Sequence, residues 1–386
     1  MNIAHITPSF YPATAYGGPL ESVYALCRSV GSEGCRVRVL TTDADGRRTI
    51  DTVEKNKDIP LAENVEIRYC KRWWPESISP SLLASLHDYV SWADVVHLMA
   101  VYSFPTIPTL MTCKALKKPL VWSPRGALER WGGTRRQAGK AVWESACRIF
   151  FPERLALHVT SDEEGQKSLK RFPGIRMAVI PNGVEASPPT PLPKGEGGGR
   201  PGEATLHLLF LGRLDPKKGI ENLLEACRQL NGQLGRPWDL KIAGSGDAHY
   251  ERKIQSYIEE KGLRRQVSMA GFVQGPEKQK LFHEADVVVA PSHTENFCMV
   301  VAEALAAGTP VIASQGTPWK RVEDMGCGLW VSNEPASLTR AISEISRKPL
   351  REMGERGRQW MQKEFTWKEV GRRMVELYQS MRVVPV

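Results

Sequence analysis

The sequence has no apolar run near the roughly 20 residues that a helix needs to cross a bilayer. The segment Met1–Phe10 also lacks the basic stretch that opens a secretory signal, so we expect it to contain the first strand of a cytoplasmic protein. The eight cysteines form no CxxC pair, and none lies in a His/Cys cluster with the spacing of a zinc site. We therefore expect reduced, packed thiols and no bound metal.

Basic charge is in surplus and unevenly distributed. The formal net charge is +9, and Lys and Arg outnumber acidic residues between Cys113 and Thr160. Such a surplus suits an anionic partner, whether nucleic acid, phosphorylated substrate or acidic membrane face, although a solvated basic surface is the simpler explanation. The sequence has no recognition helix with clustered basic residues, no RNP-like aromatic signature and no zinc finger, so we do not expect nucleic-acid binding.

Aromatic residues accompany the basic ones in two places. Trp131, Trp143, Phe150 and Phe151 lie in the basic region, and Lys71–Trp74 has the sequence KRWW. These residues suit contact with an anionic membrane surface, but packing in the core would explain the aromatic side chains equally well.

The order of elements predicts an α/β protein with two Rossmann-like domains, each a doubly wound parallel sheet. The first domain is expected over 1–184 and the second over 205–366, because strand and helix patterns alternate in both. Residues 185–204 are rich in Pro and Gly and predict a linker. The last segment, 367–386, has apolar residues at helical spacing, and we expect this helix to dock back onto the first domain. Ligands of such folds bind at the carboxyl ends of the strands, in a central cleft.

The strongest chemical signal is a pair of glutamates, Glu295 and Glu303, in the run from Ala290 to Ser314. We expect a helix to begin near Phe297, with Glu295 at its entry and Glu303 two turns inside, about 80° apart around the axis. A carboxylate accepts hydrogen bonds from vicinal hydroxyls, so Glu303 suits a ribose diol and Glu295 the hydroxyls of a sugar. The simpler alternative is that Glu295 is a first-turn residue favoured by the helix dipole and that Glu303 is a solvent-exposed helix residue.

Backbone groups next to this pair suit negative oxygens. The N–H groups of Asn296, Phe297 and Cys298 are expected at the start of the helix, where its dipole favours an anion. Together with Met299, these residues are candidates for binding a sugar nucleotide.

A second signal is the stretch LFLGRLDPKKG, residues 209–219, in which a strand leads into a basic loop. Arg213 and Lys218 are expected to neutralise a diphosphate, whose charge grows as sugar transfer expels it. Lys217 is explained as an ordinary loop residue.

Four weaker signals lie at the ends of other strands. Gly17 and Gly18 follow the first strand, and Gly244 and Gly246 follow the strand near Leu240, so backbone could approach a phosphate or a nucleoside there. His97 ends a strand of the first domain and could contact the sugar or acceptor, but a packed, hydrogen-bonded histidine is equally expected. Arg125, in the sequence SPRG, adds a cation to the same edge, or else lies in a surface turn.

Taken together, these residues resemble the retaining glycosyltransferases of family 4, which have the two-domain GT-B fold. The E-x7-E motif of that family matches Glu295 and Glu303, its phosphate-binding Arg and Lys match Arg213 and Lys218, and its first-loop double glycine matches Gly17-Gly18. Segment 179–184, VIPNGV, also fits the pattern and contains Asn182. The sequences HLMAVYSFP and SPRGAL resemble a subgroup associated with exopolysaccharide assembly.

The resemblance implies an acceptor-binding first domain, where Arg125 and Asn182 are acceptor or sugar-side candidates, and a donor-binding second domain. It implies catalytic roles for Glu295, Arg213, Lys218 and His97, retention of anomeric configuration, and no metal or other cofactor. The donor would be a UDP- or GDP-sugar, and the acceptor a glycan or a polyprenyl-diphosphate-linked glycan at the inner face of the plasma membrane.

Two departures from the family pattern affect these assignments. The family often has Gly at the position of Cys298 and near Asn296. Met99 occupies the position of the second His in the family's H-x-H pattern, so only His97 remains.

An epimerase or hydrolase that acts on a nucleotide sugar is the alternative function, and a nucleic-acid-binding protein is a remote alternative.

Overall fold

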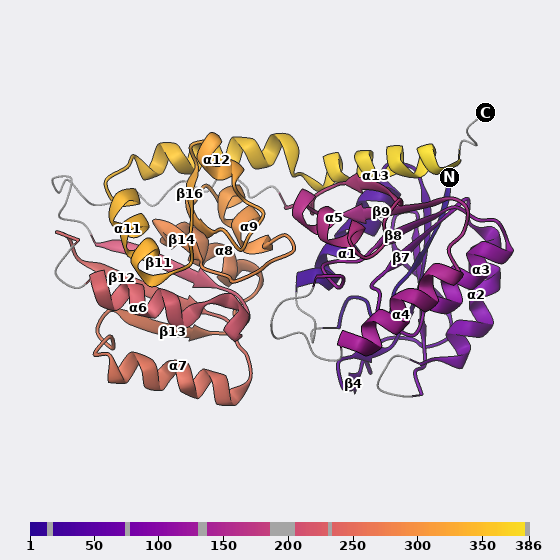
Figure 1. The fold of residues 1–386 in the computed structure, drawn as a ribbon, viewed down its shortest axis with the longest axis horizontal. Coiled ribbons are helices and arrows are strands. Elements are labelled where there is room, and N and C mark those ends of the chain that lie inside the picture. The colour runs from indigo at the N-terminus through magenta and orange to yellow at the C-terminus, as the bar shows by residue number, and fades with distance from the viewer. Residues whose placement is uncertain (14–17, 74–77, 130–136, 186–204, 231–233, 383–386) are drawn as a thin grey trace. The chain divides into compact units, whose positions relative to one another are not determined.

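The computed structural model describes the chain in six segments, which are 1–13, 18–73, 78–129, 137–185, 205–230 and 234–382 (Figure 1). Contacts within the chain divide it into two compact units: unit 1, Met1–Gly183 with Trp367–Val386, and unit 2, Val184–Thr366. Each unit has one main, largely parallel sheet with helices on both faces, which confirms the predicted pair of Rossmann-like α/β domains. The predicted linker, 185–204, lies outside the described residues except for Glu185.

Unit 1 is built on an eight-stranded sheet in the order β10-β9-β8-β7-β1-β2-β6-β5. Every neighbouring pair is parallel except β5 and β6. The strands are β1 (Asn2–Ile6), β2 (Arg36–Thr42), β5 (Asp58–Ala62), β6 (Val65–Cys70), β7 (Val95–Met99), β8 (Leu120–Ser123), β9 (Leu155–Val159) and β10 (Arg176–Val179), with the separate hairpin β3 (Ala44–Asp45) and β4 (Arg48–Thr49).

Alternating side chains of this sheet enter two apolar cores, as expected for strands buried on both faces. Ile3 packs into the core that includes α1 and α13, whereas Ala4 packs into the core that includes α2 and α3. The helices of unit 1 are α1 (Gly18–Ser32), α2 (Pro80–Trp92), α3 (Thr106–Ala115), α4 (Gln137–Ile149), α5 (Asp162–Leu169) and α13 (Trp367–Arg382).

Helix α13 follows unit 2 in the chain but packs in unit 1, alongside α1. Its apolar residues at helical spacing, among them Met374 and Tyr378, are buried. The Ser29 hydroxyl of α1 donates to the carbonyl of Trp367, and a Cβ atom at Gly371 would lie only 2.0 Å from the Ser29 Oγ. The glycine therefore permits the close approach of the two helices.

Unit 2 has a six-stranded parallel sheet in the order β13-β12-β11-β14-β15-β16. The strand order reverses between β11 and β14, which creates a topological switch point at the centre of the sheet. The elements are β11 (Leu206–Leu211), the 3-10 turn η1 (Pro216–Lys218), α6 (Ile220–Leu230), β12 (Trp238–Ala243), α7 (Ala248–Glu260), β13 (Val267–Gly271), α8 (Gly275–Glu284), β14 (Val287–Ala290), α9 (Met299–Ala307), β15 (Val311–Ser314), α10 (Arg321–Asp324), β16 (Gly328–Val331), α11 (Pro335–Ile345) and α12 (Leu350–Glu364).

Edge strand β5 and the hairpin β3–β4 were not predicted from the sequence. Most of β5 is only partly buried, so it lacks the apolar alternation that marks a strand. It reaches β6 through a turn in which Asn64 adopts a left-handed conformation (φ 57°), which asparagine tolerates well. Strands β3 and β4 have two residues each, which is too short for any periodic signal.

Candidate active site

The candidate site lies in unit 2, where the chain leaves the carboxyl ends of β11 and β14. These two strands are neighbours at the switch point, which is where doubly wound sheets bind ligands. The loop after β11 carries Arg213 and Lys218, and the loop after β14 carries Glu295. The loops touch through a hydrogen bond of 2.9 Å from the backbone N–H of His293 to the carbonyl of Lys217.

A glycine makes this contact possible. Gly219 follows η1 in a left-handed conformation (φ 67°), and a Cβ atom there would lie 2.2 Å from the carbonyl oxygen of Pro291. Any other residue would push the two loops apart. The tight turn before Gly219 is held by Asp215, whose side chain accepts from the N–H of Lys217.

Lys218 and Glu295 form an ion pair between the two loops. The Lys218 ammonium donates to Oε1 of Glu295, which also accepts from the Ser292 hydroxyl at 2.9 Å. The backbone N–H of Glu295 donates to the carbonyl of Gly316 at 2.7 Å, so main chain and side chain are both held. The side chains of Lys218 and Glu295 are 23% and 14% exposed, which leaves part of each accessible.

The charged groups around Lys218 shift its pKa. Burial by itself lowers the pKa of Lys218, but the facing Glu295 carboxylate outweighs this effect and holds the pKa above its ordinary value. Arg213 acts in the opposite direction, which places its guanidinium within electrostatic reach of Lys218. Lys218 is therefore a cation at neutral pH.

The Arg213 side chain is more exposed than those of Lys218 and Glu295. Its side chain is 63% exposed, and its contact with the Asp215 carboxylate spans 3.9 Å. A guanidinium in this position is free to turn toward a ligand, and its planar fork suits two phosphate oxygens.

Glu303 lies in α9 and pairs with Lys278 of α8, with 2.6 Å between the Lys278 Nζ and Oε1 of Glu303. It belongs to the same electrostatic environment as the first pair. Burial raises the pKa of the Cys298 thiol, the Glu295 and Glu303 carboxylates raise it further, and Lys218 opposes them. Arg213, Lys218, Glu295 and Glu303 form the switch-point cluster, in which each charge acts electrostatically on Lys218 or on the Cys298 thiol.

Comparison with known proteins identifies the family of this chain. The sequence profile described as "Glycosyltransferase Family 4" matches residues 16–187, and that described as "Glycosyl transferases group 1" matches residues 200–360. Both profiles describe glycosyltransferases and together they match most of the chain, which therefore belongs to the glycosyltransferases and has the GT-B fold.

Three similar proteins illustrate the match. An uncharacterized glycosyltransferase of Methanocaldococcus jannaschii is 34% identical over 179 residues, 44% of each chain. The GDP-mannose:cellobiosyl-diphosphopolyprenol alpha-mannosyltransferase of Xanthomonas oryzae pv. oryzae is 27% identical over 86% of this chain and 84% of that protein. The structure of sucrose-phosphate synthase from Thermosynechococcus elongatus superposes with a TM-score of 0.77 over 99% of both chains, at 22% identity. This chain spans about half the length of the first curated relatives that it matches.

The helix of the glutamate motif in this glycosyltransferase begins two residues later than predicted. Helix α9 starts at Met299, so Glu295 lies in the preceding loop and the predicted 80° angle around a shared helix is wrong. The loop and the Ser292 and Gly316 contacts position Glu295 instead. Cys298, the N-cap residue, has a left-handed backbone (φ 66°), a conformation that glycine adopts more readily.

The neighbours of Glu295 differ in their surroundings. The Phe297 side chain is buried and packs against Trp319 and Phe365 at ring-centroid distances of 5.2 and 6.2 Å, so it is not placed to contact a ligand. Asn296 and Met299 are half-buried in the same segment. Their contact with a sugar nucleotide remains a prediction.

The predicted glycine contacts have a structural explanation in unit 2. A Cβ atom at Gly244 would lie 1.8 Å from the Gly212 carbonyl oxygen, and one at Gly246 would lie 2.0 Å from that of Leu214. These glycines let the loops after β11 and β12 run closely side by side in parallel, whether or not a ligand binds there. In unit 1, Gly18 is the first residue of α1, and Gly17 lies outside the described residues.

The prediction that His97 contacts substrate is wrong for this structure. His97 has no exposed surface, its Nδ1 is 2.6 Å from the Tyr378 hydroxyl, and its Nε2 is 2.7 Å from that of Ser123. Both ring nitrogens are thus occupied inside unit 1. His97 is instead a packed, hydrogen-bonded residue, because it faces α13 and is covered by that helix.

The two acceptor-side candidates, Arg125 and Asn182, lie together. Arg125 follows β8, and its Nη1 donates to the side-chain carbonyl of Asn182, which is only 8% exposed. The sequence predicted each residue separately but gave no reason to pair them.

Lys278 and Ser292 were missed by the sequence analysis. Lys278 lies 25 residues before its partner Glu303 and on a different helix, so no local spacing connects them. Ser292 lies three residues before Glu295, and that proximity was the available signal.

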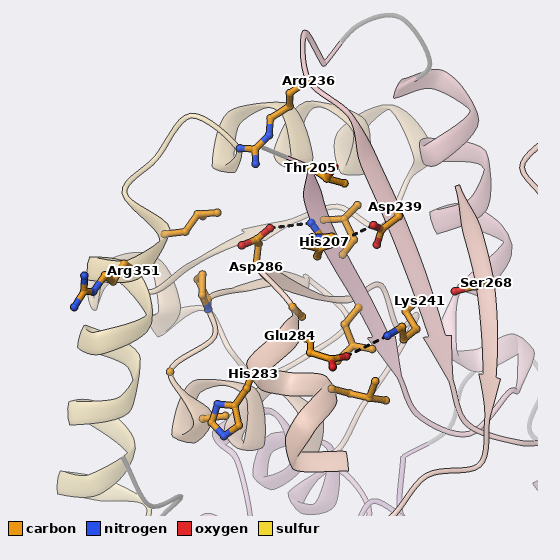
Figure 2. Close-up of a pocket in the computed structure, with 18 of the residues that line it drawn as sticks. Thr205, His207, Arg236, Asp239, Lys241, Ser268, His283, Glu284, Asp286 and Arg351 are labelled. Atoms are coloured by element: carbon orange, nitrogen blue, oxygen red, sulfur yellow. Dashed lines mark hydrogen bonds and ion pairs between the residues drawn. The ribbon is translucent and has the colours of Figure 1, made fainter. Parts of the chain in front are cut away.

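A broad groove lies on the other side of unit 2, near the amino ends of its strands (Figure 2). It has a volume of about 2240 Å³, larger than a typical small-molecule site. Its lining includes residues at the amino ends of strands and the internal pairs Lys241–Glu284 and His207–Asp239, but none of the four charges of the candidate site. Because many of its charges pair with each other, we do not assign it to sugar-nucleotide binding.

Proposed function

We propose that this glycosyltransferase moves a hexosyl group, with retention of configuration, from a UDP- or GDP-sugar to a glycan or polyprenyl-diphosphate-linked acceptor in surface polysaccharide synthesis. The Lys218–Glu295 pair at the switch point is the observation that carries this proposal. The name of the Xanthomonas relative, a polyprenol-dependent mannosyltransferase, supports the substrate class.

A cation beside a carboxylate matches the chemistry of a sugar diphosphate, in which an anion is joined directly to a polyol. Lys218 and Arg213 would bind the diphosphate oxygens, and Glu295 would accept hydrogen bonds from hydroxyls of the sugar. The charge on the leaving diphosphate increases as the glycosidic bond breaks, so both cations stabilise the transition state more than the bound donor.

Glu303 would accept hydrogen bonds from the two ribose hydroxyls. In this structure its carboxylate is held by Lys278, whose ammonium orients it and offsets its charge. Both acidic residues are thus already paired with a cation. A ligand that is itself an anion linked to alcohols can replace or share these pairs without leaving a carboxylate unpaired.

A transfer assay tests the proposed function. The purified protein is incubated with radiolabelled UDP- and GDP-hexoses and with bacterial membranes, and labelled glycan is expected from one donor. Proton NMR of the product should show the anomeric configuration of the donor, and EDTA should not change the rate. Donor conversion without acceptor would instead favour the epimerase or hydrolase alternative, and neither transfer nor conversion would contradict the proposal.

A surface on α3 and α4 supports a further part of the proposal, contact with an anionic membrane from the cytoplasmic side. Val142 and Ile149 lie on one side of α4 and are 71% and 65% exposed, with Met111 of α3 47% exposed. Lys114 donates to the carbonyl of Ile149 at 2.7 Å, which places a cation next to this apolar surface. Among the described residues, no helix is long and apolar enough to cross a bilayer.

Vesicle sedimentation tests this contact. The protein is expected to sediment with phosphatidylglycerol vesicles more than with phosphatidylcholine vesicles, because anionic lipid attracts the basic residues. The Val142→Ser/Ile149→Ser variant should lose most of this binding, whereas Leu83→Ser, at an exposed residue of α2, should not. Equal recovery with both lipids would rule out the electrostatic contribution.

A further inference from the structure

Unit 1 contains a buried layer of polar side chains at the carboxyl ends of four adjacent strands. His5 of β1 pairs in register with His97 of β7, Ser123 ends β8, and His158 lies in β9. The rings of His5 and His97 are 4.6 Å apart, and those of His97 and His158 are 5.7 Å apart. All four side chains are nearly or fully buried, so this layer is not an ordinary surface cluster.

A chain of hydrogen bonds fixes the protonation of this layer. The Ile180 carbonyl only accepts, so the Nε2 of His158, 3.0 Å away, must carry a proton. The Nδ1 of His158 then accepts from the Ser123 hydroxyl, which accepts from the Nε2 of His97, whose Nδ1 accepts from the Tyr378 hydroxyl. These roles require neutral rings, and burial keeps them neutral because it lowers the pKa of His158 to about 3 and that of His97 well below its ordinary value.

Arg125 places a positive charge beside this neutral layer. Its backbone is left-handed (φ 52°), its Nη1 donates to Asn182, and its Nε is buried without a hydrogen-bond partner. Glu164 is the acidic residue that acts on it, but the Glu164 oxygens already accept from the N–H groups of Gly126 and Thr160 at 2.6 and 2.7 Å. Among the described residues, no carboxylate lies within ion-pair distance of the Arg125 guanidinium.

A second unsatisfied group lies near the first. The Nε2 of His5 is buried without a partner, and the charge of Arg125 adds to burial in lowering the pKa of His5 to about 3. Arg373 donates to the carbonyl of Val179 at 2.7 Å and adds positive charge near His158. Buried polar atoms without partners and a guanidinium without a carboxylate are costly unless a ligand supplies their hydrogen bonds.

We propose that Arg125, His5 and Asn182 form a receptor in unit 1 for a phosphate or diphosphate group. The Arg125 guanidinium binds the anion, and the Asn182 amide, whose oxygen already faces Arg125, donates to it. The neutral His5 ring adds a donor in the tautomer that carries its proton on Nε2. Arg125 is half-buried, so part of its side chain remains accessible to the anion. The group could belong to a lipid-linked acceptor or to a soluble anion, and only the first source rests on the proposed function.

Calorimetric titration of the full-length protein tests the receptor. Farnesyl diphosphate and inorganic pyrophosphate are titrated into the wild type, Arg125→Gln, Asn182→Asp and the control Arg36→Gln, which removes a cation at the amino end of β2. At least one ligand should bind the wild type and Arg36→Gln alike, with affinity at least tenfold weaker in Arg125→Gln and Asn182→Asp. Asn182→Asp pairs with Arg125, so this variant carries the test if Arg125→Gln does not fold.

The outcomes separate the sources and the two proposals. Binding of farnesyl diphosphate alone indicates a lipid-linked ligand, and equal binding of pyrophosphate indicates a soluble anion; both support the receptor. Wild-type affinity in both Arg125→Gln and Asn182→Asp, or no binding by the wild type, overturns it. If Arg125-dependent binding is found in a protein that transfers no sugar, the proposed function fails and the receptor stands.

Discussion

Replacement of Arg213 by Ala is expected to lower kcat for sugar transfer by roughly 100- to 1000-fold, the usual effect of removing one donor that stabilises transition-state charge. The side chain is 63% exposed, so its loss should leave the melting temperature nearly unchanged. Steady-state kinetics with the donor identified in the transfer assay, together with a thermal melt, measure both effects.

Two further variants check the cause. Arg213→Lys keeps the charge but loses the planar fork, and its rate should fall between those of the wild type and Arg213→Ala. Arg252→Ala, at an exposed position on α7, should behave as the wild type. Full activity in Arg213→Ala would remove this residue from the mechanism.

Replacement of Lys218 by Met should reduce turnover by at least about 100-fold and also lower stability. It removes a cation from the diphosphate site. It also leaves the Glu295 carboxylate, which is 14% exposed, without its partner, and a buried unpaired charge is costly. Lys217→Met, at the adjacent lysine, should retain both activity and stability.

A double variant separates these two effects. Lys218→Met/Glu295→Gln removes the unpaired charge, so its melting temperature should rise above that of Lys218→Met. Its transfer rate should stay low, because neither side chain can contact the substrate as before. Recovery of activity along with stability would show that the pair is only structural.

Much of the fold was predictable because parallel strands and their crossover helices leave long periodic patterns in the sequence. The helix expected to begin near Phe297 is present as α9, and the strand and helix patterns expected to alternate over 205–366 form the sheet and helices of unit 2. The antiparallel edge strand β5 was not predicted, because its side chains are mostly half-buried and do not alternate. Apolar periodicity in the sequence therefore identifies central strands and helices better than it identifies edge strands.

The sequence pointed to the residues of the candidate site but not to their pairing. Lys218 and Glu295 were both chosen from motifs, yet the sequence did not show that they form an ion pair 77 residues apart. His97 was misplaced for a related reason: whether a strand residue faces a helix or solvent depends on α13, which comes 270 residues later in the chain. Such contacts arise from tertiary packing alone.

The central claim is that a nucleoside diphosphate binds at the switch-point cluster of unit 2 and not in the groove of Figure 2. The most direct test is calorimetric titration of UDP and GDP into the wild type, Glu303→Gln and Glu284→Gln. Both glutamates pair with a lysine in unit 2, Glu303 with Lys278 in the cluster and Glu284 with Lys241 in the groove. We expect one nucleotide to bind once per chain, at least tenfold more weakly in Glu303→Gln and unchanged in Glu284→Gln; the reverse pattern would contradict the account.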